Sequence, residues 1–194
     1  LLLSTIKINI MKIINPQDYI ANYIKAQSEV DYSEVVNAVD LIRKTWIAGH
    51  KIIAFGNGGS ALNVQHFMND WVKSSFVNKN IPFNGVSLVD NVGLLSSYAN
   101  DFSYEEVFLM QLKAILAPGD IIIAVSGSGN SENVIKAVEF ANERKNKVIS
   151  LTGFNGGSLI KLSNFAVHFP LNDMQMTEDF HLQFGHIVMK SLFE

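Results

Sequence analysis

Five short apolar runs that alternate with longer helical stretches constrain the fold of this sequence more than any other feature. The runs read "KIIAF" (51–55), "GVSLV" (85–89), "DIIIAVS" (120–126), "KVISLTG" (147–153) and "NFAVHFP" (164–170). Helices are predicted near 60–76, 91–98, 103–116, 131–145 and 175–193. Strands separated by helices indicate parallel βαβ crossovers, with helices on both faces of the sheet. We therefore expect an α/β fold: a three-layer α/β/α sandwich with a five-stranded parallel sheet of the flavodoxin or Rossmann type.

Two helical patterns precede the first apolar run. "PQDYIANYIKAQSEV" (16–30) and "DYSEVVNAVDLIRKTWIAGHK" (31–51) both repeat apolar residues at helical spacing. The first pattern places four large side chains on one face: Tyr19, Ile20, Tyr23 and Ile24. Since no linker or internal repeat interrupts the chain, we expect residues 11–194 to form one domain that carries this helical pair at about 16–50.

The first ten residues, "LLLSTIKINI", stand apart from this organisation. They are apolar but short, without a basic n-region or a cleavage-like site, so they do not resemble a secretory signal. Met11 follows directly, and two interpretations stay open. Residues 1–10 are either a non-native or disordered leader before a natural start at Met11, or a genuine flexible N-terminus.

Composition excludes several classes of partner. The net charge of −3 and the pI of about 6.0 provide no basic field for nucleic acid. The apolar runs are all shorter than the roughly 18–20 residues that a membrane span requires. Cysteine is absent, which excludes disulfides and cysteine-ligated metals and fits a reducing cytoplasm. We expect a cytoplasmic protein that binds neither nucleic acid nor membrane.

Two loops at the ends of predicted strands have an unusual composition. "GNGGSA" (56–61) follows the first run, "SGSGNS" (126–131) follows the third, and each precedes a predicted helix. Glycine lets the backbone approach an anion closely, and a helix N-terminus adds unpaired N–H groups. Serine hydroxyls supply further hydrogen bonds. In doubly wound folds ligands bind at this edge of the sheet, so the pair of loops indicates a phosphate site; tight turns and helix caps are the structural alternative.

The loops do not match the common nucleotide motifs. "GNGGSA" satisfies the dinucleotide pattern G-x-G-x-x-A, but the stretch where that motif needs an acidic residue reads "SSFVNKN". Asp90, which ends the next predicted strand, lies too far along the chain. A Walker A loop is excluded because the G-K-[ST] ending is missing. The loops therefore favour the phosphate monoester of a small molecule, with no nucleotide cofactor.

Four segments together resemble the SIS (sugar isomerase) domain, and within that family the phosphoheptose, or sedoheptulose-7-phosphate, isomerases. They are "FGNGGSALNVQHF", "ANDFSYEEVF", "GDIIIAVSGSGNSENVIKAVEFA" and "VISLTGFNGG", and the resemblance runs from about Tyr19 to the C-terminus. It implies a homotetramer with active sites at subunit interfaces. It also implies conversion of sedoheptulose 7-phosphate to D-glycero-D-manno-heptose 7-phosphate, which supplies lipopolysaccharide or capsule synthesis.

The resemblance also assigns roles to individual residues. It places Asn57, Gly58, Gly59 and Ser60 in a substrate-holding loop, Ser126, Ser128 and Ser131 around the phosphate, and Asp101 against sugar hydroxyls. The family's catalytic and zinc-binding positions fall on His66, Asp70, Glu178 and His186, so the resemblance implies one zinc ion per site. Asp70 and Glu178 stand where the family has Glu and Gln. Of the four, Asp70, His186 and Glu178 are the candidate catalytic residues.

The chemistry of these side chains suits an aldose–ketose isomerisation. The reaction moves a proton between C1 and C2 through an enediol, which needs a base at carbon and an acid/base partner at the oxygens. His66 and Asp70 lie four residues apart on one helix face, and imidazole and carboxylate both ligate zinc. Glu178 and His186 are separated by about 12 Å of helical rise, so they converge only if Glu178 lies at the helix start or if neighbouring subunits contribute.

Alternatives to this assignment stay open at the level of sequence. Thr177 is a candidate N-cap, which favours a helix that begins beside Glu178, and His181 is a rival to His186. His66 is alternatively a hydrogen-bonded core histidine, and Asp70 a solvated helix residue. The second function is that of a non-catalytic SIS protein, a phosphosugar-binding or adaptor protein that resembles the DnaA initiator-associating protein.

Overall fold

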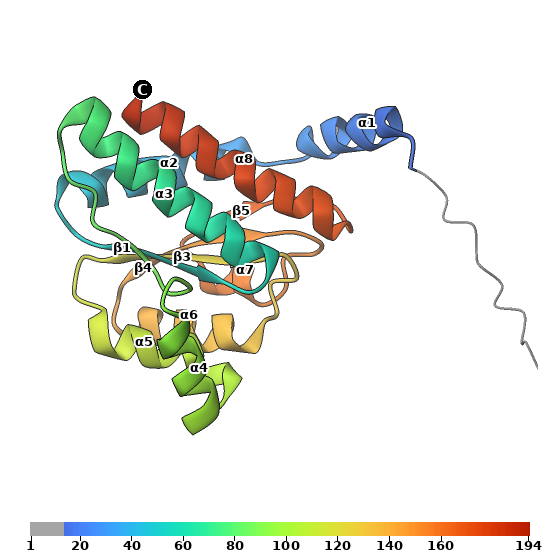
Figure 1. The fold of residues 1–194 in the computed structure, drawn as a ribbon. Coiled ribbons are helices and arrows are strands. Elements are labelled where there is room, and N and C mark those ends of the chain that lie inside the picture. Colours follow the sequence, from blue (N-terminus) through green and yellow to red (C-terminus); the bar gives the residue numbers. More distant parts are fainter. Residues whose placement is uncertain (1–13) are drawn as a thin grey trace, which may run out of the picture.

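The computed structural model describes residues 14–194, and its centre is a five-stranded sheet (Figure 1). The expectations for residues 1–10 and for a start at Met11 lie outside the described residues. Each strand coincides with one of the apolar runs in the sequence. The strands are β1 (Ile52–Gly56), β2 (Gly85–Ser87), β3 (Ile121–Ser126), β4 (Lys147–Thr152) and β5 (Phe165–His168).

The strands are all parallel, in the order β2-β1-β3-β4-β5. This is the flavodoxin-like order, so the predicted fold class is confirmed. In the central pair, Gly56 at the end of β1 is in register with Val125 of β3. Because the strands run in the same direction, the loops that follow them emerge at one edge of the sheet.

Helices occupy the stretches between the strands, with shifts of a few residues from the expected bounds. They are α1 (Pro16–Gln27), α2 (Tyr32–Ile47), α3 (Gly59–Lys79), α4 (Val92–Asp101), α5 (Val107–Ile115), α6 (Glu132–Glu143), α7 (Leu159–Leu162) and α8 (Met174–Phe193). A short 3-10 helix, η1 (Tyr104–Glu106), precedes α5, so the stretch predicted as one helix at 103–116 is divided. The sequence did not predict α7, which is a single turn.

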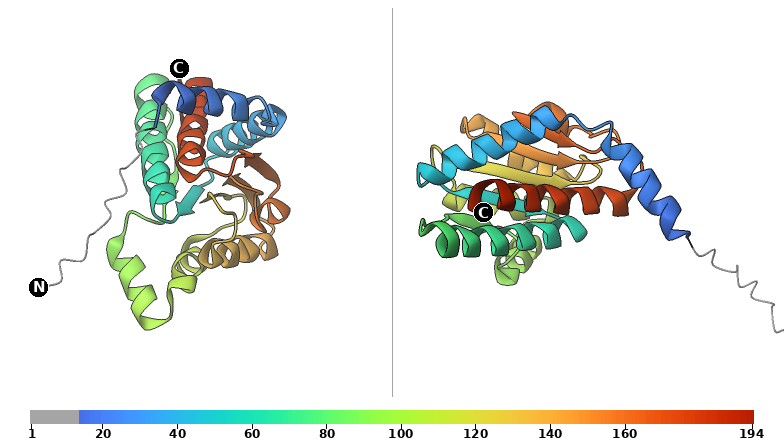
Figure 2. Two further views of the ribbon diagram at one scale, coloured as in Figure 1. Left: turned by 90° about the vertical axis from the view of Figure 1, so that its right-hand side faces the viewer. Right: turned by 90° about the horizontal axis from the view of Figure 1, so that it is seen from above.

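The helices form a layer on each face of the sheet, as Figures 1 and 2 show. On one face lie α2, α3 and α8, and on the other lie α5 and α6, with α4 further out. The side chains of β1 and β3 are buried on both faces, which explains why these strands are apolar without alternation. Within residues 14–194 every helix is too short or too polar to cross a lipid bilayer.

The first helix, α1, stands away from the sheet and meets the beginning of α8 (Figure 2). The Tyr19 hydroxyl donates to Asp179 at 2.5 Å, and the Gln27 amide donates to Gln183. The hydrogen bond to Asp179 raises the pKa of Tyr19 to about 12. Ile20 and Ile24, from the same predicted face, are instead exposed.

Candidate active site

The two glycine- and serine-rich loops enclose a cavity of about 270 Å³ at the carboxyl edge of the sheet. The first loop joins β1 to α3, and the second joins β3 to α6. The neighbouring register of β1 and β3 brings the loops together although they are about 70 residues apart in sequence. The cavity is lined by Asn57, Gly58, Gly59, Ser60, Val125, Ser126, Gly127, Ser128, Ser131, Met174 and Glu178.

Glycine is required in the first loop for two different reasons. Gly58 has φ of +53°, in the left-handed region that other residues rarely adopt. At Gly56 a Cβ atom would lie 2.6 Å from the carbonyl oxygen of Val125, so a side chain there would push β1 away from β3. The chain thus turns sharply into α3 while its backbone stays close to the neighbouring strand.

The serines of the second loop group their hydroxyls beside the start of α6. The Ser126 and Ser131 hydroxyl oxygens are 3.1 Å apart, and the Gly129 and Asn130 N–H groups donate to Ser126 and Ser128. Ser131 is the N-cap residue of α6, but its side chain meets Ser126 and does not cap the helix. The Val134 N–H donates to the Ser131 carbonyl oxygen, so the N–H groups of Glu132 and Asn133 are the ones that an anion can use.

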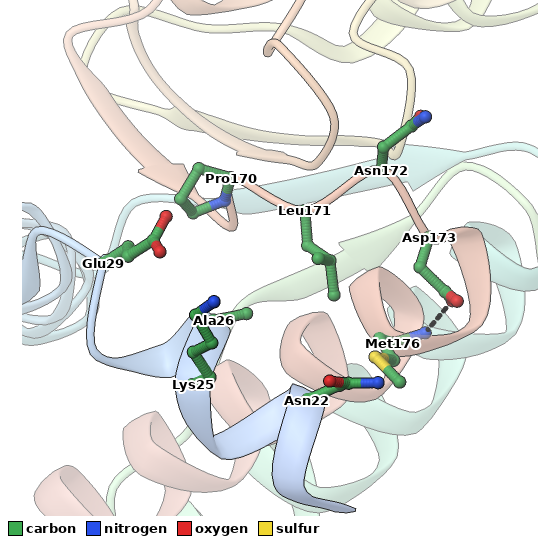
Figure 3. Close-up of a pocket in the computed structure, with 9 residues that line it drawn as sticks. All are labelled: Asn22, Lys25, Ala26, Glu29, Pro170, Leu171, Asn172, Asp173 and Met176. Carbon is green, nitrogen blue, oxygen red and sulfur yellow. Dashed lines mark hydrogen bonds between the residues drawn. The ribbon is translucent and has the colours of Figure 1, made fainter. Parts of the chain in front are cut away.

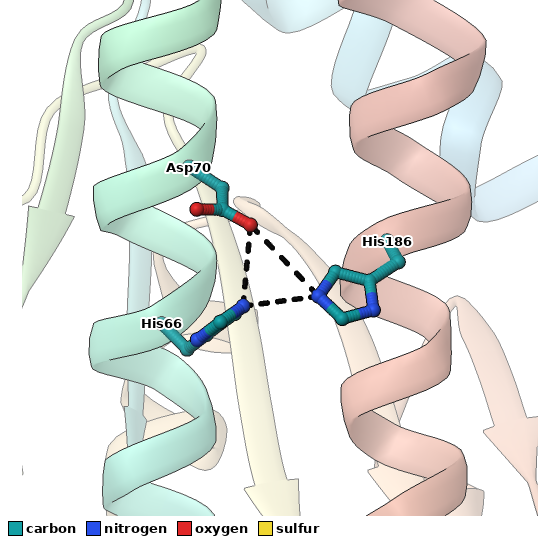
Figure 4. Close-up of side chains that lie close together, drawn as sticks. All are labelled: His66, Asp70 and His186. Atoms are coloured by element: carbon teal, nitrogen blue, oxygen red, sulfur yellow. Dashed lines mark hydrogen bonds and ion pairs between the residues drawn. The ribbon is translucent and has the colours of Figure 1, made fainter.

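A second cluster of polar side chains lies between α3 and α8 (Figure 4). The Nε2 atoms of His66 and His186 are 3.0 Å apart. The Asp70 Oδ2 atom lies 3.2 Å from His66 Nε2 and 3.9 Å from His186 Nε2. We call these three residues the His/Asp group; their potential ligand atoms lie within 4.8 Å of one another.

Close packing of α3 on α8 produces this group. At Gly185 a Cβ atom would collide with the ring of Phe67, so only glycine allows the helices to approach this closely. The Trp71 indole N–H donates to the Gly185 carbonyl oxygen at 2.9 Å and fixes the pairing from the other helix. Phe67, Trp71 and Gly185 are the chain neighbours of His66, Asp70 and His186, so these contacts set the spacing of the three side chains.

The donor set of the group fits a divalent metal. Two imidazole nitrogens and a carboxylate oxygen are typical zinc ligands, and three protein ligands leave a coordination position for substrate or water. The side chains of His66 and His186 are 44% and 47% exposed, and Asp70 is 25% exposed, so the group is reachable from solvent. A core role for His66 is therefore excluded in this chain.

Glu178 does not join the His/Asp group in this structure. Its carboxylate lies in the loop cavity, against Gly59 at the start of α3. The expectation that Thr177 caps α8 is wrong: the helix begins at Met174, where Asp173 accepts a hydrogen bond from the Met176 N–H. The extra turn places Glu178 inside the helix, about 12 Å of rise from His186.

His181 and Asp101 also lie apart from the loop cavity and the His/Asp group. His181 is completely buried, and both of its ring nitrogens have no hydrogen-bond partner among the described residues. Burial lowers its pKa to about 4, so the imidazole is neutral at pH 7 and cannot reach a substrate. Asp101 is exposed at the end of α4 and does not line the loop cavity.

The structure adds residues that the sequence did not single out. Tyr104 and Asn133 both hydrogen-bond the side chain of Asn57. Asn133 stands two residues after the second loop, so the sequence could have predicted that it lies near the loops. The sequence could not have predicted its hydrogen bond to Asn57.

A separate cavity of about 300 Å³ lies between α1 and the turn before α8 (Figure 3). Its walls come from α1, from Glu29 just after that helix and from residues 170–176, and none of the expected site residues lines it. The residues around it are Asn22, Lys25, Ala26, Glu29, Pro170, Leu171, Asn172, Asp173 and Met176.

Comparisons with known proteins agree with this architecture. The model of the SIS domain family matches residues 17–153. The phosphoheptose isomerase of Shewanella sediminis is 33% identical over 174 residues, which cover 86% of this chain and 88% of that protein. The solved phosphoheptose isomerase of Neisseria gonorrhoeae superposes with a TM-score of 0.80 at 29% identity, over 91% of this chain and 95% of that one. That of Francisella tularensis gives 0.84 at 25% identity over the same shares. The chain therefore belongs to the SIS domain family, within which it is similar to phosphoheptose isomerases.

Proposed function

We propose that this protein is an aldose–ketose isomerase that converts sedoheptulose 7-phosphate to D-glycero-D-manno-heptose 7-phosphate by proton transfer through an enediol. The observation that carries the proposal is that the same two helices, α3 and α8, contribute residues to both the loop cavity and the His/Asp group. Helix α3 supplies Ser60 to the loop cavity and His66 to the His/Asp group. Helix α8 supplies Glu178 to the first and His186 to the second.

The spacing along these helices suits a long phosphorylated sugar. Ser60 and His66 are separated by about 9 Å of rise along α3. A ligand whose phosphate lies in the loop cavity can extend along the helices and place its other end at the His/Asp group. A seven-carbon chain that carries its phosphate on the last carbon has the reacting C1 and C2 at that far end.

The loops hold the phosphate in this proposal. Ser126, Ser128 and Ser131 surround it with hydroxyls, and the N-terminal N–H groups of α6 favour its negative charge. The first loop supplies further donors from Asn57, Gly58, Gly59 and Ser60. Asp101 is assigned to the sugar hydroxyls by resemblance alone, because it lies outside the cavity walls.

The His/Asp group carries out the proton transfers. Asp70 acts as the base at carbon, and the His186 imidazole moves protons at the sugar oxygens. A zinc ion held by His66, Asp70 and His186 would polarise the carbonyl group of the sugar. Glu178 faces the ligand from the loop cavity, where its carboxylate accepts hydrogen bonds from sugar hydroxyls.

We further propose that the protein is a cytoplasmic homotetramer with its active sites at subunit interfaces. Large apolar side chains are exposed along α3 and α4: Leu62, Val72, Phe76, Val77, Val92 and Leu94. Exposed apolar surface of this extent marks an interaction site. Light scattering coupled to size-exclusion chromatography measures the oligomeric state directly, and a monomer at micromolar concentration would contradict this part of the proposal.

Turnover is tested by mixing the purified protein with sedoheptulose 7-phosphate, with and without added zinc, and following the product by NMR. We expect conversion that a chelator removes and that zinc restores. The His186→Ala variant should bind the substrate without converting it. Binding without turnover by the wild-type protein under every metal condition would contradict the isomerase and favour a non-catalytic phosphosugar-binding protein.

A further inference from the structure

The side chain of Asn57 is held by a hydrogen-bond arrangement that joins three separate segments. Its amide and that of Asn133 pair reciprocally: each Nδ2 donates to the other's Oδ1 at 2.9 Å. The Tyr104 hydroxyl donates to the same Asn57 Oδ1 atom at 2.8 Å. The three residues come from the first loop, from α6 and from η1.

This arrangement leaves Asn57 only one way to meet a ligand. The Oδ1 atom accepts two hydrogen bonds, which is its full capacity, and one of the two N–H groups of Nδ2 is used by Asn133. The other N–H has no partner among the described residues. Because Asn57 lines the loop cavity, it offers this N–H donor to an oxygen atom of the ligand.

The reciprocal pair also ties the two loops together. Asn133 is 3% exposed and lies in the first turn of α6, directly after the serine-rich loop. Because Asn133 lies directly after the second loop, its hydrogen bonds to Asn57 hold the first loop at a constant distance from the second. Two hydrogen bonds between the same two amides, one of which is buried, favour a single arrangement of both segments.

We propose that Asn133 and Tyr104 are positioning residues that hold Asn57 as a hydrogen-bond donor to a phosphorylated sugar and fix the spacing of the two loops around its phosphate. This deepens the proposed function and rests on it, since it assumes that a phosphorylated sugar occupies the loop cavity. Neither residue needs to contact the ligand, because both act through the amide of Asn57.

The test is a double-mutant cycle on ligand binding. Tyr104→Phe removes one hydroxyl from a side chain that is 55% exposed, and we expect affinity for sedoheptulose 7-phosphate to fall roughly threefold to tenfold, as for one hydrogen bond. Asn133→Ala should cost about tenfold or more. In an Asn57→Ala background, both substitutions should change the affinity less than twofold, because the residue through which they act is gone. Calorimetry measures the dissociation constants.

Matched controls separate positioning from general damage. Tyr98→Phe removes a hydroxyl on α4, and Asn142→Ala removes an amide at the opposite end of α6; neither residue lines the cavity. Both controls should bind as the wild type does. If Asn133→Ala does not fold, Tyr104→Phe decides the question alone, because its side chain is largely exposed.

The outcomes distinguish this inference from the proposed function. Equal losses in the wild-type and Asn57→Ala backgrounds would overturn the positioning role, whether or not the enzyme turns over. Wild-type affinity in both single variants would overturn it as well. If the double-mutant cycle shows the expected coupling but the wild-type protein does not convert the sugar, the inference is supported and only the isomerase is contradicted. Failure of the wild-type protein to bind any phosphorylated sugar would contradict both.

Discussion

The loop cavity and the His/Asp group are built in opposite ways. The cavity is made mainly from two continuous segments, each of which turns directly from a buried strand into a helix, and Met174 and Glu178 of α8 complete its wall. The His/Asp group is made from single side chains on two long helices, and His66 and His186 are 120 residues apart in sequence. One feature depends on local backbone conformation, and the other depends on how closely α3 packs against α8.

This difference indicates how the two features divide their work. Backbone N–H groups and short hydroxyl side chains provide a rigid cradle for an anion of constant shape. Side chains on packed helices can be aimed at reacting atoms, but a small shift between the helices changes their spacing, and a displacement of about 1 Å can cost a hundredfold in rate. We therefore expect substitutions in the two regions to separate binding from chemistry.

The largest effect is expected at the His/Asp group. His186→Ala should lower kcat by about 10²- to 10⁴-fold, the range for loss of an acid/base group. The affinity for inorganic phosphate should change less than twofold, because His186 lies about 12 Å along α8 from Glu178 in the cavity. Steady-state kinetics and calorimetry measure the two quantities. His50→Ala, at an exposed histidine before β1, is the matched control. If His186→Ala lowered the affinity for phosphate as much as it lowers kcat, the separation of binding from chemistry between the two regions would be wrong.

The stability of the protein should fall in acid because of a histidine on α8, a helix that contributes to both regions. His181 lies between Glu178 and His186 and is buried in neutral form, with its pKa lowered to about 4 from the ordinary value of 6.5. The unfolded chain takes up the proton first as the pH falls. The free energy of unfolding should therefore drop by up to roughly 3 kcal/mol between about pH 6.5 and pH 4, with the full contribution present above pH 6.5.

Chemical denaturation at a series of pH values measures this slope. His181→Leu should remove most of it, whereas His50→Ala should leave it unchanged. The same slope in the His181→Leu variant would show that other groups govern acid unfolding. Activity comparisons between the two regions are best made above pH 6.5, where the scaffold is fully stable.

The serine loop should discriminate ligands by their phosphate. Ser128→Ala removes a hydroxyl at the cavity wall, and a hydrogen bond to a charged group contributes about 1.5–3 kcal/mol. Affinity for sedoheptulose 7-phosphate should fall about tenfold to a hundredfold, while affinity for unphosphorylated sedoheptulose should stay within twofold. Ser97→Ala, on α4 away from the cavity, is the control. Equal losses for both sugars would refute the assignment of this loop to phosphate.

The smallest effect is expected from a change in helix packing. Gly185→Ala places a methyl group against the Phe67 ring, and overpacking of this kind costs about 1–3 kcal/mol. The shift of α8 should also weaken zinc binding about tenfold by separating His66 from His186. Gly93→Ala, where the added Cβ would meet only the Asn91 side-chain oxygen at 3.1 Å, is the control. Wild-type zinc affinity in Gly185→Ala would mean that the group does not depend on this contact.

Most of the fold could be read from the sequence. Apolar runs of strand length, separated by amphipathic stretches, leave few arrangements other than a parallel sheet covered on both faces. Gly58 and the serines of the second loop could also be located, because a left-handed turn and a hydroxyl-rich loop depend on a few residues of chain, whereas the requirement for glycine at 56 comes from Val125 on the neighbouring strand. The single turn of α7 was not predicted. The start of α8 was predicted to within one residue, but its cap was assigned to Thr177, whereas the side chain of Asp173 caps the helix.

The sequence by itself determined the strands, their parallel arrangement, the chemistry of the two loops and the family. Only the tertiary structure decided that His66, Asp70 and His186 meet, that Glu178 lies in the cavity and that Asn57 pairs with Asn133. The physical reason is the range of the interactions. Periodicity and turn conformation depend on neighbours in the chain, whereas these meetings depend on the distance between packed helices and on the register of adjacent strands.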